Sequence, residues 1–279
     1  TDGGASFTVS ELEPWIAYST YHDFDMPQTC RSGSTVFATF TTEDPNDNPR
    51  VSHLYLCRST DGGLSFHAPI NLTAGLVIPA YAMHTVAARG SSVYVAFAEV
   101  NGIRAGRVLL RRALDGGVTW QPLQELTGGG NSTFEPGWEP RLALGAGPGG
   151  HDQVHLLWEA DGYRVSQDSG SSFSPPVHLK TFHSAFNPGS SGTLRQPRVA
   201  LDAEGTFHFN SVGYYSWGSN YIVGYRRQAP MPAGVEQNQG LQFSVVPADH
   251  RNDTLQIPGG PSLALARRPW WPIWGLSDL

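Results

Sequence analysis

Short runs of apolar and β-branched residues, each following a turn that contains glycine, recur along the chain. Runs of this length and composition are typical of β-strands. We interpret each as the second strand of a repeated unit. The four runs are residues 35–40 (Thr-Val-Phe-Ala-Thr-Phe), 92–97 (Ser-Val-Tyr-Val-Ala-Phe), 153–158 (Gln-Val-His-Leu-Leu-Trp) and 206–211 (Thr-Phe-His-Phe-Asn-Ser).

A further apolar run follows in each unit, as at residues 53–57, 107–111 and 221–225, and leads directly into a short motif. The motif contains an aspartate, a glycine two residues later and an aromatic residue three residues after that glycine. We predict that it forms the turn between the third and fourth strands. Its aspartates are Asp2, Asp61, Asp115 and Asp168, and residues 238–243 form a degenerate fifth copy in which an amide replaces the acid.

The motif aromatics stand at positions 7, 66, 120, 173 and 243, so neighbouring copies are 53 to 70 residues apart. Repeats of this period are typical of the blades of β-propellers. In such a turn the aspartate accepts backbone N–H bonds, glycine supplies a positive φ angle, and the aromatic ring packs between sheets. We therefore predict that the four aspartates have a structural role.

The motif and its spacing resemble those of the Asp-box, or BNR-repeat, propellers of the sialidase superfamily. The resemblance extends over almost the whole chain and implies a single all-β domain, residues 1–279, built from four-stranded antiparallel blades. The same motif occurs in sialidases, other glycosidases, lectins and receptor ectodomains. Function must therefore be argued from the site rather than from the fold.

The first motif lies at the N-terminus, whereas the C-terminal segment supplies strand-like runs at residues 262–266 and 271–274. We predict that the two ends share one blade, which would close the ring and remove exposed sheet edges. Five blades result, or six if residues are missing from the chain. Sialidases of this superfamily have six blades, so a count of five argues against a sialidase unless the chain is incomplete.

Composition narrows the choice of partners. The formal charge of −6 and the absence of any run of Lys or Arg make nucleic acid an unfavourable partner. No apolar stretch reaches the length of a membrane-spanning helix, so we expect a chain that does not span a membrane. Three Asn-x-Thr tripeptides, at residues 71–73, 131–133 and 252–254, suit an exported protein, extracellular or periplasmic. Cys30 and Cys57 flank one unit and are candidates for a disulfide.

Ligands of propellers gather where the innermost strands begin. Aligning the units puts Gln28, His84, Arg141, Arg198 and Ser262 at equivalent points. Two arginines facing one cavity would present planar forks to a carboxylate, as in an acidic sugar. The alternative is that each arginine pairs with a neighbouring acid such as Glu139.

By resemblance, a sialidase needs three arginines on the substrate carboxylate, a Tyr–Glu nucleophile pair and an aspartate acid/base catalyst. A third arginine would have to come from Arg31, Arg195 or Arg226. Asp23, Asp25 and Glu159 are acid/base candidates, since two carboxylates across a sugar can cleave it. Tyr214 is the candidate nucleophile. The alternatives are loop acids, turn caps and strand-end packing.

Trp217, in a loop rich in Gly and Ser, is a candidate platform for stacking on a sugar. Residues 270–274 contain three tryptophans, which form either a partner surface or filling between blades. The histidines show no metal-ligand spacing; His151 and His155 lie four apart, and we expect them to face solvent. We predict no metal and no cofactor.

Three hypotheses remain open. The first is a glycan- or protein-binding module that acts through its channel mouth. The second is a sialidase-like exo-glycosidase in which Arg141 and Arg198 hold a carboxylate. The third is a subunit of a larger assembly, which should present a large apolar surface patch rather than converging polar groups.

Overall fold

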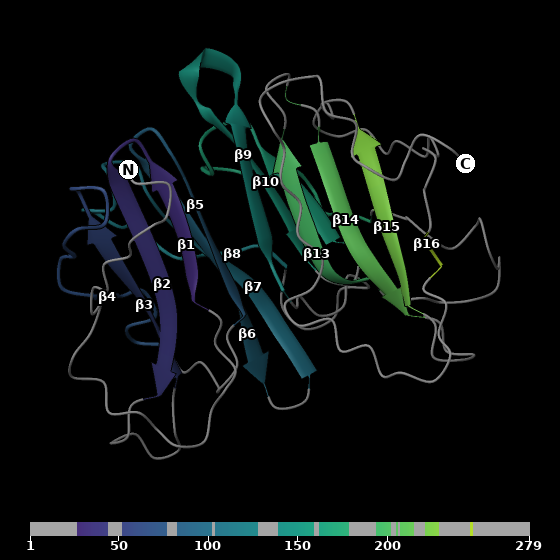
Figure 1. Cartoon of the computed structure of the whole chain (residues 1–279), viewed down its shortest axis with the longest axis horizontal. Helices are drawn as coiled ribbons and strands as arrows, with labels where there is room; N and C mark the ends of the chain where they lie inside the picture. Colours follow the sequence, from purple (N-terminus) through teal and green to yellow (C-terminus); the bar gives the residue numbers. More distant parts are fainter. Residues whose placement is uncertain are drawn as a thin grey trace, which may run out of the picture.

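The computed structural model describes residues 27–43, 52–76, 83–101, 104–127, 139–158, 162–178, 194–201, 205, 207–214, 221–228 and 246–247. These residues form four antiparallel sheets of four strands each (Figure 1). In every sheet the strands are neighbours in the order in which they occur along the chain. Each sheet is therefore an up-and-down meander that one continuous segment can build with short turns.

The strand bounds repeat the same plan four times. Sheet 1 contains β1 (Gln28–Ser32), β2 (Thr35–Glu43), β3 (Ser52–Ser59) and β4 (Ile70–Asn71). Sheet 2 contains β5 (His84–Arg89), β6 (Ser92–Asn101), β7 (Arg104–Ala113) and β8 (Gln124–Glu125). Sheet 3 contains β9 (Arg141–Ala146), β10 (Asp152–Trp158), β11 (Gly162–Ser166) and β12 (Val177–His178). Sheet 4 contains β13 (Leu194–Leu201), β14 (Phe207–Tyr214), β15 (Tyr221–Gln228) and β16 (Val246–Pro247).

The all-β prediction is confirmed. Each predicted second-strand run lies in β2, β6, β10 or, apart from its first residue, β14, and the runs that follow lie in the third strands β3, β7 and β15. Within the described residues the only helix is a single 3-10 turn, Pro148–Gly150, in the β9–β10 hairpin. A search of the same residues found no helix of the length and apolarity needed to cross a bilayer.

The four sheets fan out side by side, with their first strands next to one another. Strand β1 contacts β5, β5 contacts β9, and β9 contacts β13. Figure 1 shows the sheets following one another in sequence order from purple to yellow-green. This is the arrangement of consecutive blades in a β-propeller, in which the first strands lie innermost.

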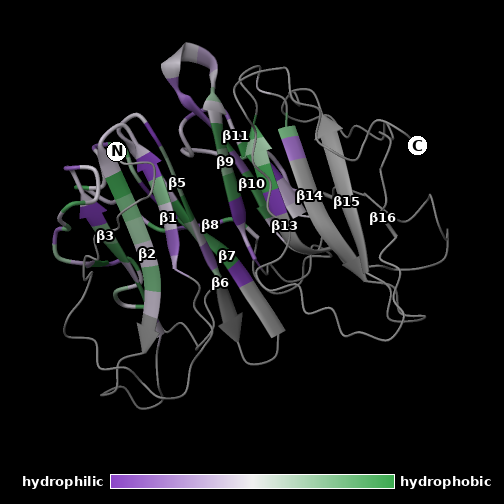
Figure 2. Cartoon of the chain, viewed as in Figure 1, coloured by the Kyte–Doolittle hydropathy of each residue, from purple (hydrophilic) through white to green (hydrophobic). Residues whose placement is uncertain are grey.

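Three apolar cores lie between neighbouring sheets rather than within any one of them (Figure 2). All seven residues of β10 are buried, because sheets 2 and 4 cover the two faces of sheet 3. Burial on both faces explains why the second strands read as nearly continuous apolar runs instead of alternating ones. The cores combine Phe37, Leu56 and Phe97 between sheets 1 and 2, Tyr94, Leu110 and Leu156 between sheets 2 and 3, and Tyr163 and Phe207 between sheets 3 and 4.

The candidate disulfide between Cys30 and Cys57 does not form. Cys30 pairs with Phe37 and Cys57 with Ala38, so the two cysteines lie on β1 and β3 with β2 between them. Two strand spacings separate their Cα atoms by about 10 Å, which is well beyond disulfide reach. Burial raises the pKa of the Cys30 thiol to about 12. The end segments predicted to close the ring, which include Asp2, Ser262 and residues 270–274, lie outside the described residues.

Candidate functional site

The motif aspartates Asp61, Asp115 and Asp168 lie between the third and fourth strands of sheets 1, 2 and 3. In sheet 1, Asp61 Oδ1 accepts hydrogen bonds from the backbone N–H of Leu64 (2.9 Å) and Ser65 (3.0 Å). Asp61 Oδ2 accepts one from Ser65 Oγ (2.6 Å), and Ser59 Oγ donates to Oδ1 (2.7 Å). Hydrogen bonds from Ser65 and Ser59 lower the pKa of Asp61 well below its usual range. The carboxylate is therefore committed to closing its own turn.

The turns of sheets 2 and 3 repeat this geometry. Asp115 accepts from the N–H of Val118 (3.0 Å) and Thr119 (2.9 Å), and Asp168 accepts from the N–H of Ser172 (2.9 Å). Burial alone would raise the pKa of Asp168, but the hydrogen bonds, chiefly those from Ser172, lower it to about 2. These acids act as structural groups of the turn.

Two arginines that the sequence motifs did not single out join the turns of sheets 2 and 3 to the preceding sheet. Arg58 Nη1 donates to the carbonyl of Gly116 (3.2 Å), and Arg112 donates to the carbonyl of Ser169 and to Ser171 Oγ. Both stand three residues before a motif aspartate, so their common offset in the repeat could have identified them. The aromatic residues act as predicted: Trp120 packs on the core between sheets 1 and 2, and Phe173 on the core between sheets 2 and 3.

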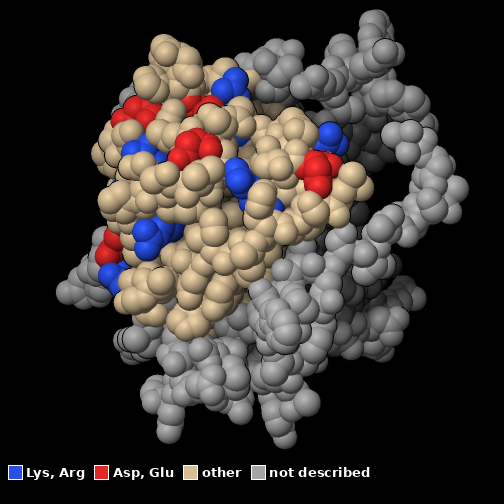
Figure 3. All heavy atoms as spheres, turned by 90° about the vertical axis from the view of Figure 1, so that its left-hand side faces the viewer, with Lys and Arg blue, Asp and Glu red and all other residues tan. Residues whose placement is uncertain are grey.

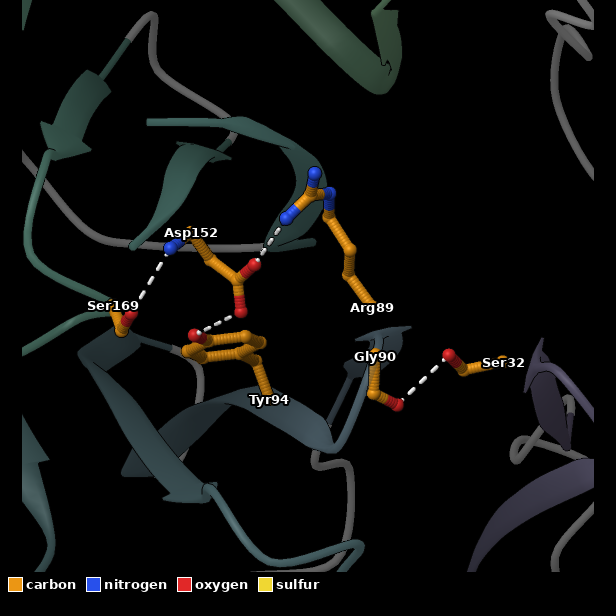
Figure 4. Close-up of polar contacts among 6 residues, drawn as sticks. All are labelled: Ser32, Arg89, Gly90, Tyr94, Asp152 and Ser169. Atoms are coloured by element: carbon orange, nitrogen blue, oxygen red, sulfur yellow. Dashed lines mark hydrogen bonds and ion pairs between the residues drawn. The ribbon is translucent and has the colours of Figure 1, made fainter. Parts of the chain in front are cut away.

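A second polar group, here called the hairpin-side joint, consists of Arg89, Tyr94, Asp152 and Ser169 (Figure 4). Asp152 begins β10, while Arg89 ends β5 and Tyr94 lies on β6. Arg89 Nη1 donates to Asp152 Oδ1 (2.8 Å), and the Tyr94 hydroxyl donates to Oδ2 (2.9 Å). Ser169 Oγ accepts the backbone N–H of Asp152 (2.9 Å). Both oxygens of a buried carboxylate are thus satisfied across the boundary between sheets 2 and 3.

A tyrosine next to a carboxylate invites comparison with a nucleophile pair, but the environment opposes that role. Tyr94 is fully buried. Burial, together with the hydrogen bond to Asp152 and its negative charge, raises the Tyr94 pKa to about 12. Because a nucleophile needs access and a lowered rather than raised pKa, the hairpin-side joint acts as a structural contact.

The opposite end of the sheets holds the residues predicted to face a ligand. Gln28, His84 and Arg141 are the first residues of β1, β5 and β9, and Arg198 lies in β13 after an irregularity in its pairing with β14. These residues therefore lie on four first strands that contact one another in turn, β1 with β5, β5 with β9 and β9 with β13. Arg141 and Asp152 are at opposite ends of the β9–β10 hairpin, about 17 Å apart along the strand.

Glu139, Arg141 and Arg198 form what we call the strand-start cluster. The Arg141 Nη2 and Glu139 Oε2 atoms are 3.6 Å apart, and each side chain is only 14% exposed. Burial and, to a lesser degree, the positive charge of Arg198 lower the pKa of Arg141 to about 10, although the negative charge of Glu139 opposes both effects. Burial also lowers the Arg198 pKa, again opposed by Glu139. Glu139 is thus the ion-pair partner of Arg141, and its negative charge also acts on Arg198.

Glu139 itself is poorly accommodated. Its Oε2 atom is buried and has no hydrogen-bond partner. Its backbone has φ +45°, a left-handed value that is unusual for a residue other than glycine. Proline follows at position 140, and a residue before proline ordinarily prefers the extended region. The pairing of Arg141 with a neighbouring acid, considered from the sequence as an alternative, is thus present, but as a loose contact.

Several predicted site residues lie outside the described residues: Asp23, Asp25, Glu159 and Trp217. Tyr214 is the last residue of β14, where its backbone pairs with Tyr221. Arg31 does not reach the strand-start cluster, because its Nε donates to the carbonyl of Gly33 (2.6 Å) in the β1–β2 hairpin at the other end. It cannot serve there as a third arginine.

One expectation about histidines was wrong. His151 is exposed, but His155 is buried, and its Nδ1 lies 2.7 Å from the hydroxyl of Tyr163. His155 faces the core between sheets 3 and 4 because β10 is covered on both sides. Burial lowers its pKa to about 4. The described part of the chain holds no group of three or more His, Cys, Asp or Glu residues arranged for a metal ion.

Charges on one outer face are mixed. Figure 3 shows the side that lies on the left of Figure 1, where acidic and basic side chains are interspersed among uncharged residues. The residues that the structure describes on this face form no basic patch of the kind that holds a phosphate backbone.

No protein-family profile matches the chain, and no curated protein matches it. Among solved structures, a protein of unknown function from Dyadobacter fermentans is 14% identical with a TM-score of 0.45, and the match covers 70% of this chain and 50% of that one. The NanB sialidase of Streptococcus pneumoniae is 13% identical with a TM-score of 0.46, covering 70% and 29%. A GH43 endo-arabinanase from Bacillus licheniformis is 13% identical with a TM-score of 0.41, covering 78% and 76%. None of these values places the chain in one of these families.

Proposed function

We propose that this chain is an exported Asp-box β-propeller of five blades that binds an acidic glycan at the strand-start cluster. The four described sheets would be four of these blades, and the two ends of the chain would share the fifth. Arg141 and Arg198 would hold the ligand carboxylate, while Gln28 and His84, on the neighbouring first strands, would contact its hydroxyl groups.

The observation that carries this proposal is the approach of two arginines from adjacent innermost strands. Two positive charges in a partly buried setting repel each other, and burial weakens the hydration that would otherwise stabilise them. A bound carboxylate offsets both effects and matches the planar fork of each guanidinium group. A sugar acid supplies that carboxylate together with hydroxyl groups for polar neighbours.

Hydrolysis of the glycan would need acid/base groups in addition to the arginines. The candidate catalytic residues stay predictions from the sequence; they are Asp23, Asp25, Glu159 and Tyr214. Binding is the proposal favoured here because it requires only the groups of the strand-start cluster.

The test is to measure binding of sialylated and uronic-acid oligosaccharides, and of their neutral counterparts, by calorimetry. Arg141→Ala and Arg198→Ala should each weaken binding of the acidic ligands at least about tenfold, as expected for losing a charged hydrogen bond of about 1.5–3 kcal/mol. Arg31→Ala, at the other end of the sheet, is the matched control and should bind normally. Thermal melts check folding.

Two results would count against the proposal. The first is equal affinity for acidic and neutral ligands, and the second is an equal loss in the Arg31→Ala control. Release of a fluorophore from a sialoside by the wild type, lost in both cluster variants, would instead favour the hydrolase alternative.

A further inference from the structure

We propose that Glu139 occupies the anion site of the strand-start cluster as an internal competitor, which the carboxylate of an acidic ligand displaces. This inference rests on the proposed function. It adds that the resting site is already filled by a group of the chain itself, so that the outward movement of Glu139 sets the affinity for the ligand.

The ion pair between Glu139 and Arg141 is longer than a well-formed ion pair. In a well-formed ion pair, the donor nitrogen and the acceptor oxygen are about 2.7–2.9 Å apart. In the same protein, Arg89 Nη1 and Asp152 Oδ1 are 2.8 Å apart. Glu139 Oε2 is 3.6 Å from Arg141 Nη2 and accepts no hydrogen bond, although it is buried. Charge holds this oxygen near Arg141, without a directional hydrogen bond that would make the contact hard to break.

The backbone conformation of Glu139 also favours its displacement. Glu139 has φ +45° and precedes Pro140, so it departs from the ordinary preference of a side-chain-bearing residue and from that of a residue before proline. Residues held in such conformations occur at ligand clamps and switch regions. If Glu139 leaves the cluster, its backbone can return to the extended region, and this change favours the displaced state.

The charges of the strand-start cluster allow one carboxylate to replace another. Glu139 acts on both Arg141 and Arg198, as a ligand carboxylate bound between them would. Exchange of one carboxylate for another keeps the charge of the cluster constant. A neutral sugar cannot make this exchange, because it brings no negative charge to replace that of Glu139. Selectivity for acidic over neutral ligands follows from the competition itself.

The test compares three substitutions at this one position. Glu139→Gln keeps the shape and removes the charge, Glu139→Asn removes the charge with a residue that tolerates left-handed backbone, and Glu139→Asp keeps a carboxylate. The ligand is free N-acetylneuraminic acid, measured by calorimetry alongside wild type and Arg141→Ala. If the competent state of the wild type is populated at about one part in ten, both neutral variants should bind about tenfold more tightly. Glu139→Asp should remain close to wild type.

The outcomes separate this inference from the proposed function. Tighter binding by the neutral variants, including binding that appears only in them, supports the competitor. Weaker binding by Glu139→Gln and Glu139→Asn, with wild-type binding that depends on Arg141, overturns the inference and makes Glu139 a positioning residue for the arginines. Absence of binding in the wild type and in both folded neutral variants overturns the proposed function as well.

Discussion

The hairpin-side joint and the strand-start cluster each bring arginine and a carboxylate together, at opposite ends of the same β9–β10 hairpin. In the joint, Asp152 has a hydrogen-bond donor on each oxygen, at 2.8 and 2.9 Å. In the cluster, Glu139 Oε2 has no hydrogen bond and lies 3.6 Å from Arg141 Nη2. The joint links one carboxylate to one arginine, whereas the cluster balances two arginines against one acid.

This difference separates structural groups from groups that are available to a ligand. A buried polar network stabilises a fold only when every member is satisfied, and a partly satisfied one is costly. The joint meets that condition, because each oxygen of its carboxylate accepts a hydrogen bond. The cluster does not meet it, because Glu139 Oε2 is buried and accepts no hydrogen bond. The predictions below test whether the two regions differ in this way.

The largest effect is expected from removing the carboxylate of the joint. Asp152→Ala leaves the buried Tyr94 hydroxyl without its acceptor and Arg89 without its counter-ion, so the free energy of unfolding should fall by about 3 kcal/mol. Urea unfolding measures it. Glu125→Ala is the matched control, because the Arg107–Glu125 pair has a similar distance, 2.9 Å, but lies at the surface. That variant should lose less than about 1 kcal/mol; equal losses would remove the distinction between a complete joint and an ordinary surface pair.

Acid should weaken the protein through His155, which lies on the same strand as Asp152. The folded-state pKa of His155 is lowered to about 4 by burial, so the folded protein binds this proton less readily than the unfolded chain does. Stability is therefore full above the unfolded pKa of about 6.5 and falls as the pH drops towards 4. The full loss is on the order of 3 kcal/mol.

Unfolding by urea at a series of pH values measures this loss. His155→Phe keeps a ring in the core and should flatten the curve between pH 6.5 and pH 4. A curve that stays as steep in this variant would assign the acid sensitivity to other groups, and the carboxylates of the two compared regions would be examined next.

A smaller effect tests the rigidity of the motif turns. Gly117 has φ +81°, and an added Cβ would lie 3.0 Å from Phe37 of the neighbouring sheet. Gly117→Ala should cost about 2 kcal/mol, combining backbone strain with crowding. Gly116→Ala shares a positive φ of 76° but has its nearest atom at 3.9 Å, so it should cost only about 1 kcal/mol. Thermal melts compare them, and identical costs would mean that the close approach of the two sheets is not a constraint.

The smallest effect is expected at the strand-start cluster. Glu139→Gln removes a buried charge whose Oε2 atom accepts no hydrogen bond, and the relieved desolvation offsets part of the lost attraction to the arginines, so the unfolding free energy should fall by less than about 1 kcal/mol. Asp152→Asn, the same chemical change in the joint, should cost about 2 kcal/mol. Similar losses in urea unfolding of the two variants would show that the two regions are held alike.

Much of the fold could be predicted from local sequence. Strand order, the four-stranded unit and the position of the motif turns follow from short-range patterns, because each sheet is built by one continuous segment. The equivalence of His84 and Arg141 at the starts of innermost strands also follows from the repeat. The Asp152–Tyr94 contact does not, since it joins different units, and no spacing in the sequence marks it.

By itself the sequence determined the repeating unit, since strands and turns depend on neighbouring residues and on the glycine and aspartate chemistry of the motif. Only the tertiary structure decided which buried polar groups have hydrogen-bond partners. It separated Cys30 from Cys57 by a strand, buried His155 against the next sheet, joined Arg89 to Asp152, and left Glu139 in a long ion pair with Arg141. The physical reason is that these outcomes depend on how neighbouring sheets pack, and packing brings together residues that lie far apart in the chain.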